Sequence, residues 1–244
     1  MNGADVNQEW IPYCGPGATP MDMAGRWNLD PVLLLALAAL LALLWFQARG
    51  RRALAVVGVG LLAISFVSPL CALSSALFAA RTVHHLLLVA AAAPLLVWAT
   101  RPRIGGLAAA TAMQTIVFWI WHAPGAYSAA LSSDLVYWVM QLSLLGSAVW
   151  FWSGVRRASA PGAIAGLLIT TVQMGLLGAL IAFAGQPLYE PHLLTTAAWG
   201  LSPLEDQQVA GLLMWAPALG LYLAAALWRV GKLIGPGEAR PVVL

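Results

Sequence analysis

Seven apolar segments, each long enough to cross a lipid bilayer, occupy most of this 244-residue chain and constrain its fold more than any other feature. About 20 apolar residues in a helix cover the ~30 Å hydrocarbon core of a membrane. Every backbone polar group must be satisfied inside lipid, and segments of this length do so as helices. The segments lie at about residues 31–48, 53–72, 82–100, 105–121, 134–153, 162–184 and 208–230.

The composition excludes an ordinary soluble domain. Only 9% of the residues are charged, 61% are hydrophobic and the mean hydropathy is +0.82, whereas soluble domains carry roughly 25% charged residues. We therefore expect an all-α integral membrane protein, a bundle of seven transmembrane helices over residues 31–230, with tails at 1–30 and 231–244. The lipid bilayer is the expected environment, and no nucleic-acid partner is expected.

The basic residues predict the orientation of the bundle. Ten of the 12 Lys and Arg residues follow the first, third, fifth and seventh segments, which places them all on one side. Only Arg26 and Arg81 fall on the opposite side. Cytoplasmic loops of membrane proteins carry an excess of Lys and Arg. The split predicts an outside N-terminus, a cytoplasmic C-terminus and a multi-pass protein of the bacterial plasma (inner) membrane.

All the histidines and cysteines fall on the predicted outer side. Ionisable groups near a membrane are costly and mark candidate functional sites, and imidazole and thiolate are ligands of copper and zinc. The candidate metal ligands are His84, His85, His122, Cys71 and Cys14. His84 and His85 are neighbours about 100° apart on a helix, so we expect one of them to face the bundle. In the alternative interpretation, these histidines only hydrogen-bond neighbouring helices.

The two cysteines have two interpretations. A turn over Trp10–Pro16, rich in Pro and Gly, should hold Cys14 in place. Outside the cytoplasm disulfides are permitted, so Cys14 and Cys71 could pair and fix the tail to the second segment. Equally, they could be thiolates that bind a metal.

Other polar residues have candidate roles within the bundle. Glu205 and Asp206 begin the last segment on the outer side and could orient an imidazole through its second nitrogen, as carboxylates often do behind a metal ligand. Gln114, Gln141 and Gln173 lie near the middle of their segments. We expect them to hydrogen-bond across helices, worth ~0.6–2 kcal/mol each; the alternative is a polar path across the membrane.

Four short motifs together resemble the CtaG family of membrane proteins, named for the assembly of caa-type cytochrome c oxidase. They are Ser68-Pro69-Leu70, His85 followed by Ala93-Pro94, Phe118-Trp-Ile-Trp-His122-Ala-Pro124, and Asp206-Gln207-Gln208 followed by Met214-Trp215. The resemblance extends over about residues 28–230. It adds Met214 to the candidate ligands and Gln207 to the residues supporting them. This chain departs from the family pattern at Arg81, where a histidine is expected, and at Gln141, in a stretch where a histidine is also expected.

The resemblance implies a non-enzymatic assembly factor that handles or delivers copper at the outer face. The implied partners are subunits of a copper-containing cytochrome c oxidase and periplasmic copper chaperones. Two alternatives are a transporter of copper or another small solute, and a metal-free scaffold for oxidase subunits. A transporter should continue its polar residues toward the cytoplasmic side, whereas here they fade beyond the midplane glutamines, which favours assembly.

Overall fold

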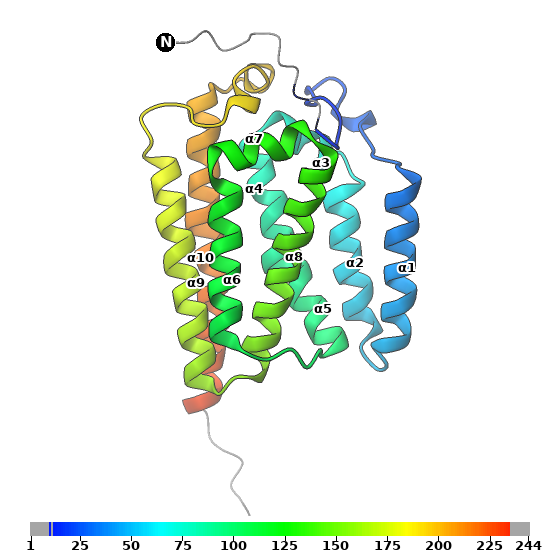
Figure 1. Cartoon of the computed structure of the whole chain (residues 1–244), viewed down its shortest axis with the longest axis vertical. Coiled ribbons are helices and arrows are strands. Elements are labelled where there is room, and N and C mark those ends of the chain that lie inside the picture. The colour runs from blue at the N-terminus through cyan, green and yellow to red at the C-terminus, as the bar shows by residue number, and fades with distance from the viewer. Residues whose placement is uncertain (1–9, 11, 235–244) are drawn as a thin grey trace, which may run out of the picture.

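All regular structure in the described part of the chain is helical (Figure 1). The computed structural model describes residue 10 and residues 12–234. The α-helices are α1 (Pro31–Gln47), α2 (Arg52–Phe66), α3 (Leu70–Ala76), α4 (Phe78–Leu86), α5 (Ala93–Thr100), α6 (Leu107–His122), α7 (Pro124–Ser132), α8 (Asp134–Arg157), α9 (Ala160–Ala182) and α10 (Pro203–Ile234). Shorter elements are η1 (Met23–Gly25), the π-helical η2 (Leu87–Ala92), η3 (Glu190–His192) and η4 (Thr196–Trp199).

Each predicted apolar segment contains helix, and the helix ends differ from those expected by at most five residues. The second segment is broken between α2 and α3. Within the described residues, four helices could cross a membrane by length and composition, namely Phe78–Thr100, Asp134–Arg157, Ala160–Ala182 and Pro203–Ile234. A fifth is added if α2 and α3, bent by 44°, count as one span. The 17 residues of α1 reach only about 25 Å at 1.5 Å per residue. The all-helical fold is confirmed, with several helices long and apolar enough to cross a membrane; seven spans and their orientation stay predictions.

The bundle has two chemically different ends. At the lower end in Figure 1 lie the α1–α2, α5–α6 and α8–α9 connections and the end of α10, which together hold the described basic residues other than Arg26 and Arg81. We call this the basic end. At the other end, which we call the tail end, lie the N-terminal segment, α3, α7, η3 and η4 (Figure 1). Of the predicted C-terminal tail, residues 231–234 belong to α10. The rest of the tail, including Arg240, lies outside the described residues.

The third predicted segment is interrupted by a π-helical turn. Pro94 has no N–H, so one carbonyl preceding it loses its intrahelical donor. In the i to i−5 register of η2 that carbonyl belongs to Val89, and Trp152 Nε1 on α8 donates to it at 2.8 Å. The bulge is thus satisfied from a neighbouring helix, and it follows directly after the two adjacent histidines of α4.

Two glycines allow α9 and α10 to approach backbone to backbone. A Cβ added to Gly211 would lie 2.6 Å from the carbonyl oxygen of Gly178, and one added to Gly178 would lie 2.8 Å from the carbonyl oxygen of Gly211. No larger residue fits at either position without moving a helix. This contact fixes α10, whose first turn in turn holds the start of α4.

Candidate functional site

The site is built on α4, which places polar side chains inside an apolar bundle. Arg81 and His84 have no exposed surface, and His85 is 3% exposed. The segment that carries them begins under the first turn of α10, where Asp206 accepts hydrogen bonds from Phe78 N at 2.7 Å and Ala79 N at 3.1 Å. A carboxylate at a helix N-terminus satisfies free N–H groups and interacts favourably with the helix dipole.

Three imidazoles form a continuous cluster in the core. The ring centroids of His84 and His85 are 5.7 Å apart, and those of His85 and His122 are 5.9 Å apart at an interplanar angle of 82°. Both neighbours on α4 are buried, so the expectation that only one of them faces the bundle is wrong. Both α3 and α10 pack against α4, so other helices cover α4 on more than one side.

Most ring nitrogens of this cluster have no hydrogen-bond partner of normal geometry among the described residues. His122 Nδ1 lies 2.7 Å from the carbonyl oxygen of Phe118, and since a carbonyl only accepts, Nδ1 carries the proton and Nε2 carries the lone pair. Both ring nitrogens of His85 are buried without a hydrogen-bond partner among the described residues. His84 makes no hydrogen bond of normal geometry there, although the backbone of Ser65 lies near its ring. Buried polar atoms are nearly always paired, so these imidazole nitrogens are available to bind a ligand.

The geometry fits a metal ion held by few ligands. Two His–metal bonds of about 2.0–2.1 Å place the two nitrogens about 4 Å apart, which is compatible with imidazole centroids separated by 5.9 Å. Within residues 10 and 12–234, no group of three or more His, Cys, Asp or Glu side chains is arranged to hold a metal. The cluster therefore suits a two-coordinate ion better than a tetrahedral one.

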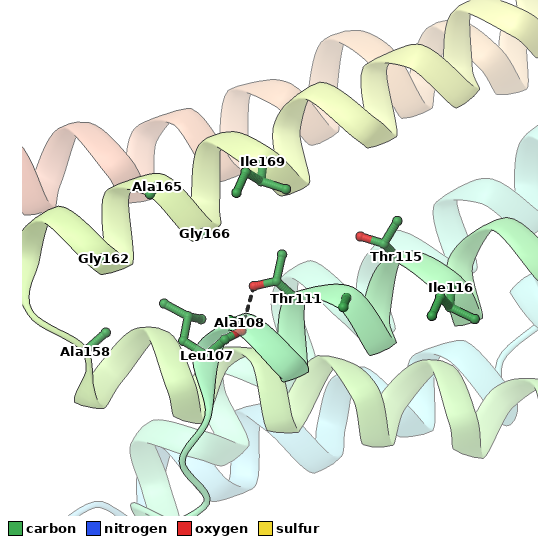
Figure 2. A pocket seen from close by; sticks show the side chains of 11 residues that line it. Leu107, Ala108, Thr111, Thr115, Ile116, Ala158, Gly162, Ala165, Gly166 and Ile169 are labelled. Carbon is green, nitrogen blue, oxygen red and sulfur yellow. Dashed lines mark hydrogen bonds between the residues drawn. The ribbon is translucent and has the colours of Figure 1, made fainter.

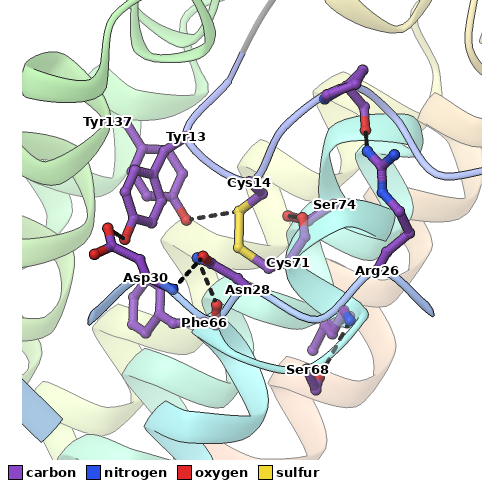
Figure 3. Close-up of a disulfide and its surroundings, with 12 residues drawn as sticks. Tyr13, Cys14, Arg26, Asn28, Asp30, Phe66, Ser68, Cys71, Ser74 and Tyr137 are labelled. Carbon is purple, nitrogen blue, oxygen red and sulfur yellow. Dashed lines mark hydrogen bonds between the residues drawn. A yellow bond between two sulfur atoms is a disulfide. The ribbon is translucent and has the colours of Figure 1, made fainter. Parts of the chain in front are cut away.

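The cysteines pair with each other. Cys14 and Cys71 form a disulfide with Cα atoms 5.3 Å apart (Figure 3), and the predicted turn is present, with Gly15 N donating to Pro12 O at 2.7 Å. A disulfide sulfur is not a thiolate, so Cys14 and Cys71 are removed from the candidate metal ligands. Of the two interpretations of the cysteines, the structure supports the covalent attachment of the tail.

The tail also completes the end of α2. Asn28 Nδ2 donates to Phe66 O at 3.2 Å and Asn28 N donates to Val67 O at 2.9 Å. These carbonyls lie at the C-terminus of a helix, where they have no intrahelical donor. Together with the disulfide, these bonds fix the tail over the tail end of the bundle (Figure 3).

Neither predicted carboxylate orients an imidazole. Both oxygens of Asp206 are engaged by the backbone of α4. Glu205 is exposed and accepts from the backbone and hydroxyl of Ser202, both at 2.8 Å. Each carboxylate caps a helix N-terminus, Asp206 that of α4 and Glu205 that of α10, and their predicted role behind a histidine is corrected accordingly.

Gln207 and Met214 are likewise engaged elsewhere. Gln207 accepts from Leu188 N at 2.7 Å and donates to Ile181 O at 3.2 Å, so it holds the α9–α10 connection. The Met214 side chain is 1% exposed and packs against Gly178 of α9. Neither residue shows a contact with the imidazole cluster among the described interactions.

His192 is separate from the cluster and is fully paired. Its Nε2 lies 2.6 Å from the hydroxyl of Tyr127, and its Nδ1 lies 3.2 Å from the carbonyl oxygen of Ala76. The carbonyl requires a proton on Nδ1, so Nε2 accepts from the tyrosine. Burial lowers the pKa of His192 to about 3, which keeps it neutral. Its role is to join the α9–α10 connection to α3 and α7.

The midplane glutamines divide into two kinds. Gln173 accepts from Trp119 Nε1 at 2.8 Å, and Gln114 donates to the hydroxyl of Tyr222 at 3.4 Å, which confirms cross-helix bonding for both. Gln141 is 1% exposed, and its amide makes no hydrogen bond of normal geometry among the described residues, although the hydroxyl of Tyr137 lies near it. It contributes to the lining of a cavity of about 420 Å³ between α1, α2 and α8.

A larger groove near the basic end is lined almost entirely by apolar side chains. It measures about 680 Å³ and lies between α6 and α9 (Figure 2). Its walls are mostly Ala, Gly, Leu and Ile, with hydroxyls only from Thr111 and Thr115, and Thr111 bonds to its own helix at Leu107 O. The groove has no metal ligand or charged side chain and is not part of the site.

Sequence reasoning did not recognise Arg81 as a site residue. Its side chain is fully buried beside the imidazoles, and its only described aromatic contact is with the ring of Tyr137, 5.3 Å from the guanidinium carbon. The sequence did mark Arg81 as unusual. It is one of only two basic residues away from the basic end, and it directly precedes a long apolar segment.

Comparison with known proteins gives one match. A family model described as cytochrome c oxidase caa3 assembly factor matches residues 104–234. That range includes His122, Asp206 and Gln207 and ends with α10. No curated protein and no solved structure matches the chain.

Proposed function

This chain belongs to the family of cytochrome c oxidase caa3 assembly factors, and we propose that it serves assembly by holding a copper ion at the imidazole cluster of His84, His85 and His122. The copper is cargo for the oxidase rather than a resident cofactor. The ion is bound near the tail end of the bundle, and the remaining helices form the support that positions it.

The observation that carries this proposal is the pair formed by His85 and His122. Their centroids are 5.9 Å apart, His85 has two unpaired nitrogens, and His122 is held by Phe118 O in the tautomer that leaves Nε2 free. A hydrogen bond to the second nitrogen is how proteins fix a ligating imidazole. Histidines that served only packing would instead bond to neighbours through both nitrogens, as His192 does.

The number and kind of ligands favour monovalent copper. Structural zinc takes four ligands in a tetrahedron, and the described residues bring no such group together. Imidazole suits copper, and an ion of single charge costs less to bury than a divalent one. Among the described residues no carboxylate contacts the cluster, which points the same way, because hard divalent ions prefer oxygen ligands.

The orientation of the bundle in the membrane is inferred from the side on which the basic residues lie. If Arg49, Arg101 and Arg157 face the cytoplasm, the imidazole cluster lies toward the outer face, where copper centres of an oxidase would be reached from outside. The polar residues of the site do not continue to the basic end, where the groove between α6 and α9 is apolar. This supports delivery at one face rather than transport across the membrane.

The test is Cu(I) binding by the purified protein in competition with a chromogenic chelator. Wild type should bind one Cu(I) per chain, and His85→Ala and His122→Ala should each weaken binding at least tenfold. Gln114→Leu is the matched control, since Gln114 is buried in another part of the bundle and bonds to Tyr222. Its copper affinity should equal that of wild type.

The same variants are then tested for oxidase maturation in cells. His85→Ala and His122→Ala should accumulate normally and leave the oxidase deficient in copper, while Gln114→Leu should support maturation. Normal copper content of the oxidase with the double variant would show that the protein acts as a metal-free scaffold. Copper uptake by vesicles that contain only this protein would favour a transporter.

A further inference from the structure

Arg81 is a buried charge without a counter-ion. Its guanidinium has no exposed surface, and Nε, Nη1 and Nη2 make no hydrogen bond of normal geometry among the described residues. The neutral hydroxyls of Tyr127 and Tyr137 lie near the guanidinium, but neither supplies a negative charge. Arginine cannot shed its proton in a protein. An unpaired buried charge costs several kcal/mol, whereas a cation–π contact such as that with Tyr137 returns only about 0.5–2 kcal/mol.

The carboxylates described in the structure are engaged elsewhere or exposed. Asp30 accepts from Tyr13 and Val32, and both oxygens of Asp206 are bound by α4. Within residues 10 and 12–234, Asp22 and Arg26 form the only ion pair. The remaining described acids, Asp134, Glu190 and Glu205, are exposed. The described part of the chain thus supplies no anion to Arg81.

We propose that Arg81 is the recognition group of a buried anion site that takes a single carboxylate. A guanidinium presents paired N–H groups in a planar fork that matches the two oxygens of a carboxylate. A monoanion also neutralises the single charge, whereas a phosphate would leave an excess of negative charge in a core. Arg81 lines neither of the two cavities described above, so the ligand is small or is the tip of a side chain.

The carboxylate has two possible sources with the same chemistry. It could be a free small acid, or an Asp or Glu side chain of the oxidase subunit that receives the cargo. In either case binding has a consequence for the imidazole cluster, and this consequence rests on the function proposed above. The positive charge of Arg81 acts on His84 and His85, so it opposes a metal cation there until a carboxylate neutralises it.

The test uses metal-free full-length protein, in lipid nanodiscs with a copper chelator, and does not depend on copper binding. Sodium formate replaces sodium methanesulfonate at constant ionic strength while thermal unfolding is followed. A ligand that binds only the folded state stabilises it by mass action. We expect a saturable rise in Tm of about 5–10 °C at formate concentrations about 100-fold above Kd.

The variants assign the effect to Arg81. Arg81→Gln should unfold at a temperature equal to or above that of wild type without formate, because it removes an unpaired charge, and should not respond to formate. Arg81→Lys, which keeps the charge without the fork, should respond more weakly. Arg103→Gln, a change at an exposed arginine of the basic end, should respond as wild type does.

Three results would overturn the assignment. They are no effect of formate on wild type, an equal effect on Arg81→Gln, and an equal effect of chloride, which lacks two-point geometry. A second arm then distinguishes the sources. If saturating formate reduces capture of oxidase subunits by wild type but not by Arg81→Gln, the carboxylate belongs to the partner; unchanged capture assigns a free acid.

Discussion

The carboxylate of Asp206 on α10 lies at the first turn of α4 and accepts a 2.7 Å hydrogen bond from the backbone N–H of Phe78, 128 residues earlier in the chain. Leu77, just before that turn, has extended backbone and offers no side-chain cap, so α4 depends on α10 for its start. The contact therefore fixes the position of Arg81, His84 and His85 along the axis of the bundle.

Asp206→Ala should therefore lower the free energy of unfolding by about 2–3 kcal/mol, because it leaves two buried N–H groups without an acceptor. Asp206→Asn should cost less, since its single carbonyl oxygen can still accept. Denaturant unfolding in mild detergent measures both. Glu205→Ala is the control: Glu205 caps from an exposed position, so its loss should cost about 0.5–1 kcal/mol. Equal losses at the two sites would contradict the bridging role of Asp206.

Loss of the disulfide should loosen the tail without disturbing the core. Cys14 and Cys71 are 57 residues apart in sequence, and closing a loop of that length stabilises a fold by about 4 kcal/mol in the chain-entropy model. Cys14→Ser should show a loss of about 2–4 kcal/mol in unfolding free energy. Cys71→Ser and the double variant should match it. An additional loss in the double variant would mean that each thiol contributes independently.

His192 should make stability depend on pH. Its pKa in the folded protein is about 3, below the ordinary value of 6.5. Between these values the unfolded chain binds a proton that the folded protein excludes, so stability is lost as pH falls below 6.5. From pH 7.5 to 5.5, His192 should account for about 1 kcal/mol of lost stability. His192→Gln should reduce the pH dependence by that amount; an unchanged slope would show that other groups cause it.

The contact between α9 and α10 should tolerate no added atom at Gly211. A Cβ there would lie within 2.8 Å of three atoms of α9, two of them backbone atoms. Gly211→Ala should therefore cost at least about 3 kcal/mol of stability or prevent accumulation. Gly220→Ala, on the same helix with nothing within 4 Å of the added Cβ, should be neutral or slightly stabilising. Similar behaviour of the two variants would contradict the close crossing.

Reporter fusions test the orientation on which the placement of the site depends. Fusions after residues 50 and 157, both in basic-end connections, should report a cytoplasmic location, and a fusion after residue 195 should report export. An exported reporter at 157 would invert the bundle and place the imidazole cluster toward the cytoplasm.

The helices could be predicted from the sequence because backbone polar groups in lipid must be hydrogen-bonded within their own segment. Apolar runs such as 162–184 must be helical to satisfy their backbone, and the structure has α9 at Ala160–Ala182. The same rule made breaks hard to foresee. The π-turn before Pro94, for example, depends on Trp152, which donates to Val89 O from a helix more than 50 residues later.

The polar residues show more clearly what the sequence alone cannot predict, namely which groups hydrogen-bond to each other. Asp206 and Glu205 are adjacent and looked equivalent, yet one bridges two helices and the other caps its own. The sequence predicts both His85 and His192 on the outer side, and only the fold gave His192 two hydrogen-bond partners and left His85 with none among the described residues. A hydrogen bond depends on which groups lie within about 3 Å, and no spacing along the chain reports that distance for residues on different helices.

The sequence by itself therefore determined that this chain is helical, apolar enough for a membrane and polar at one end, because hydropathy and charge act through each residue's own contact with lipid or water. Only the tertiary structure decided that Cys14 pairs with Cys71, that Asp206 supports α4, and that Arg81 lies beside His84 and His85 with no carboxylate partner among the described residues. Those relationships are set by the packing of helices against one another, where a shift of one turn exchanges every neighbour that a buried side chain can reach.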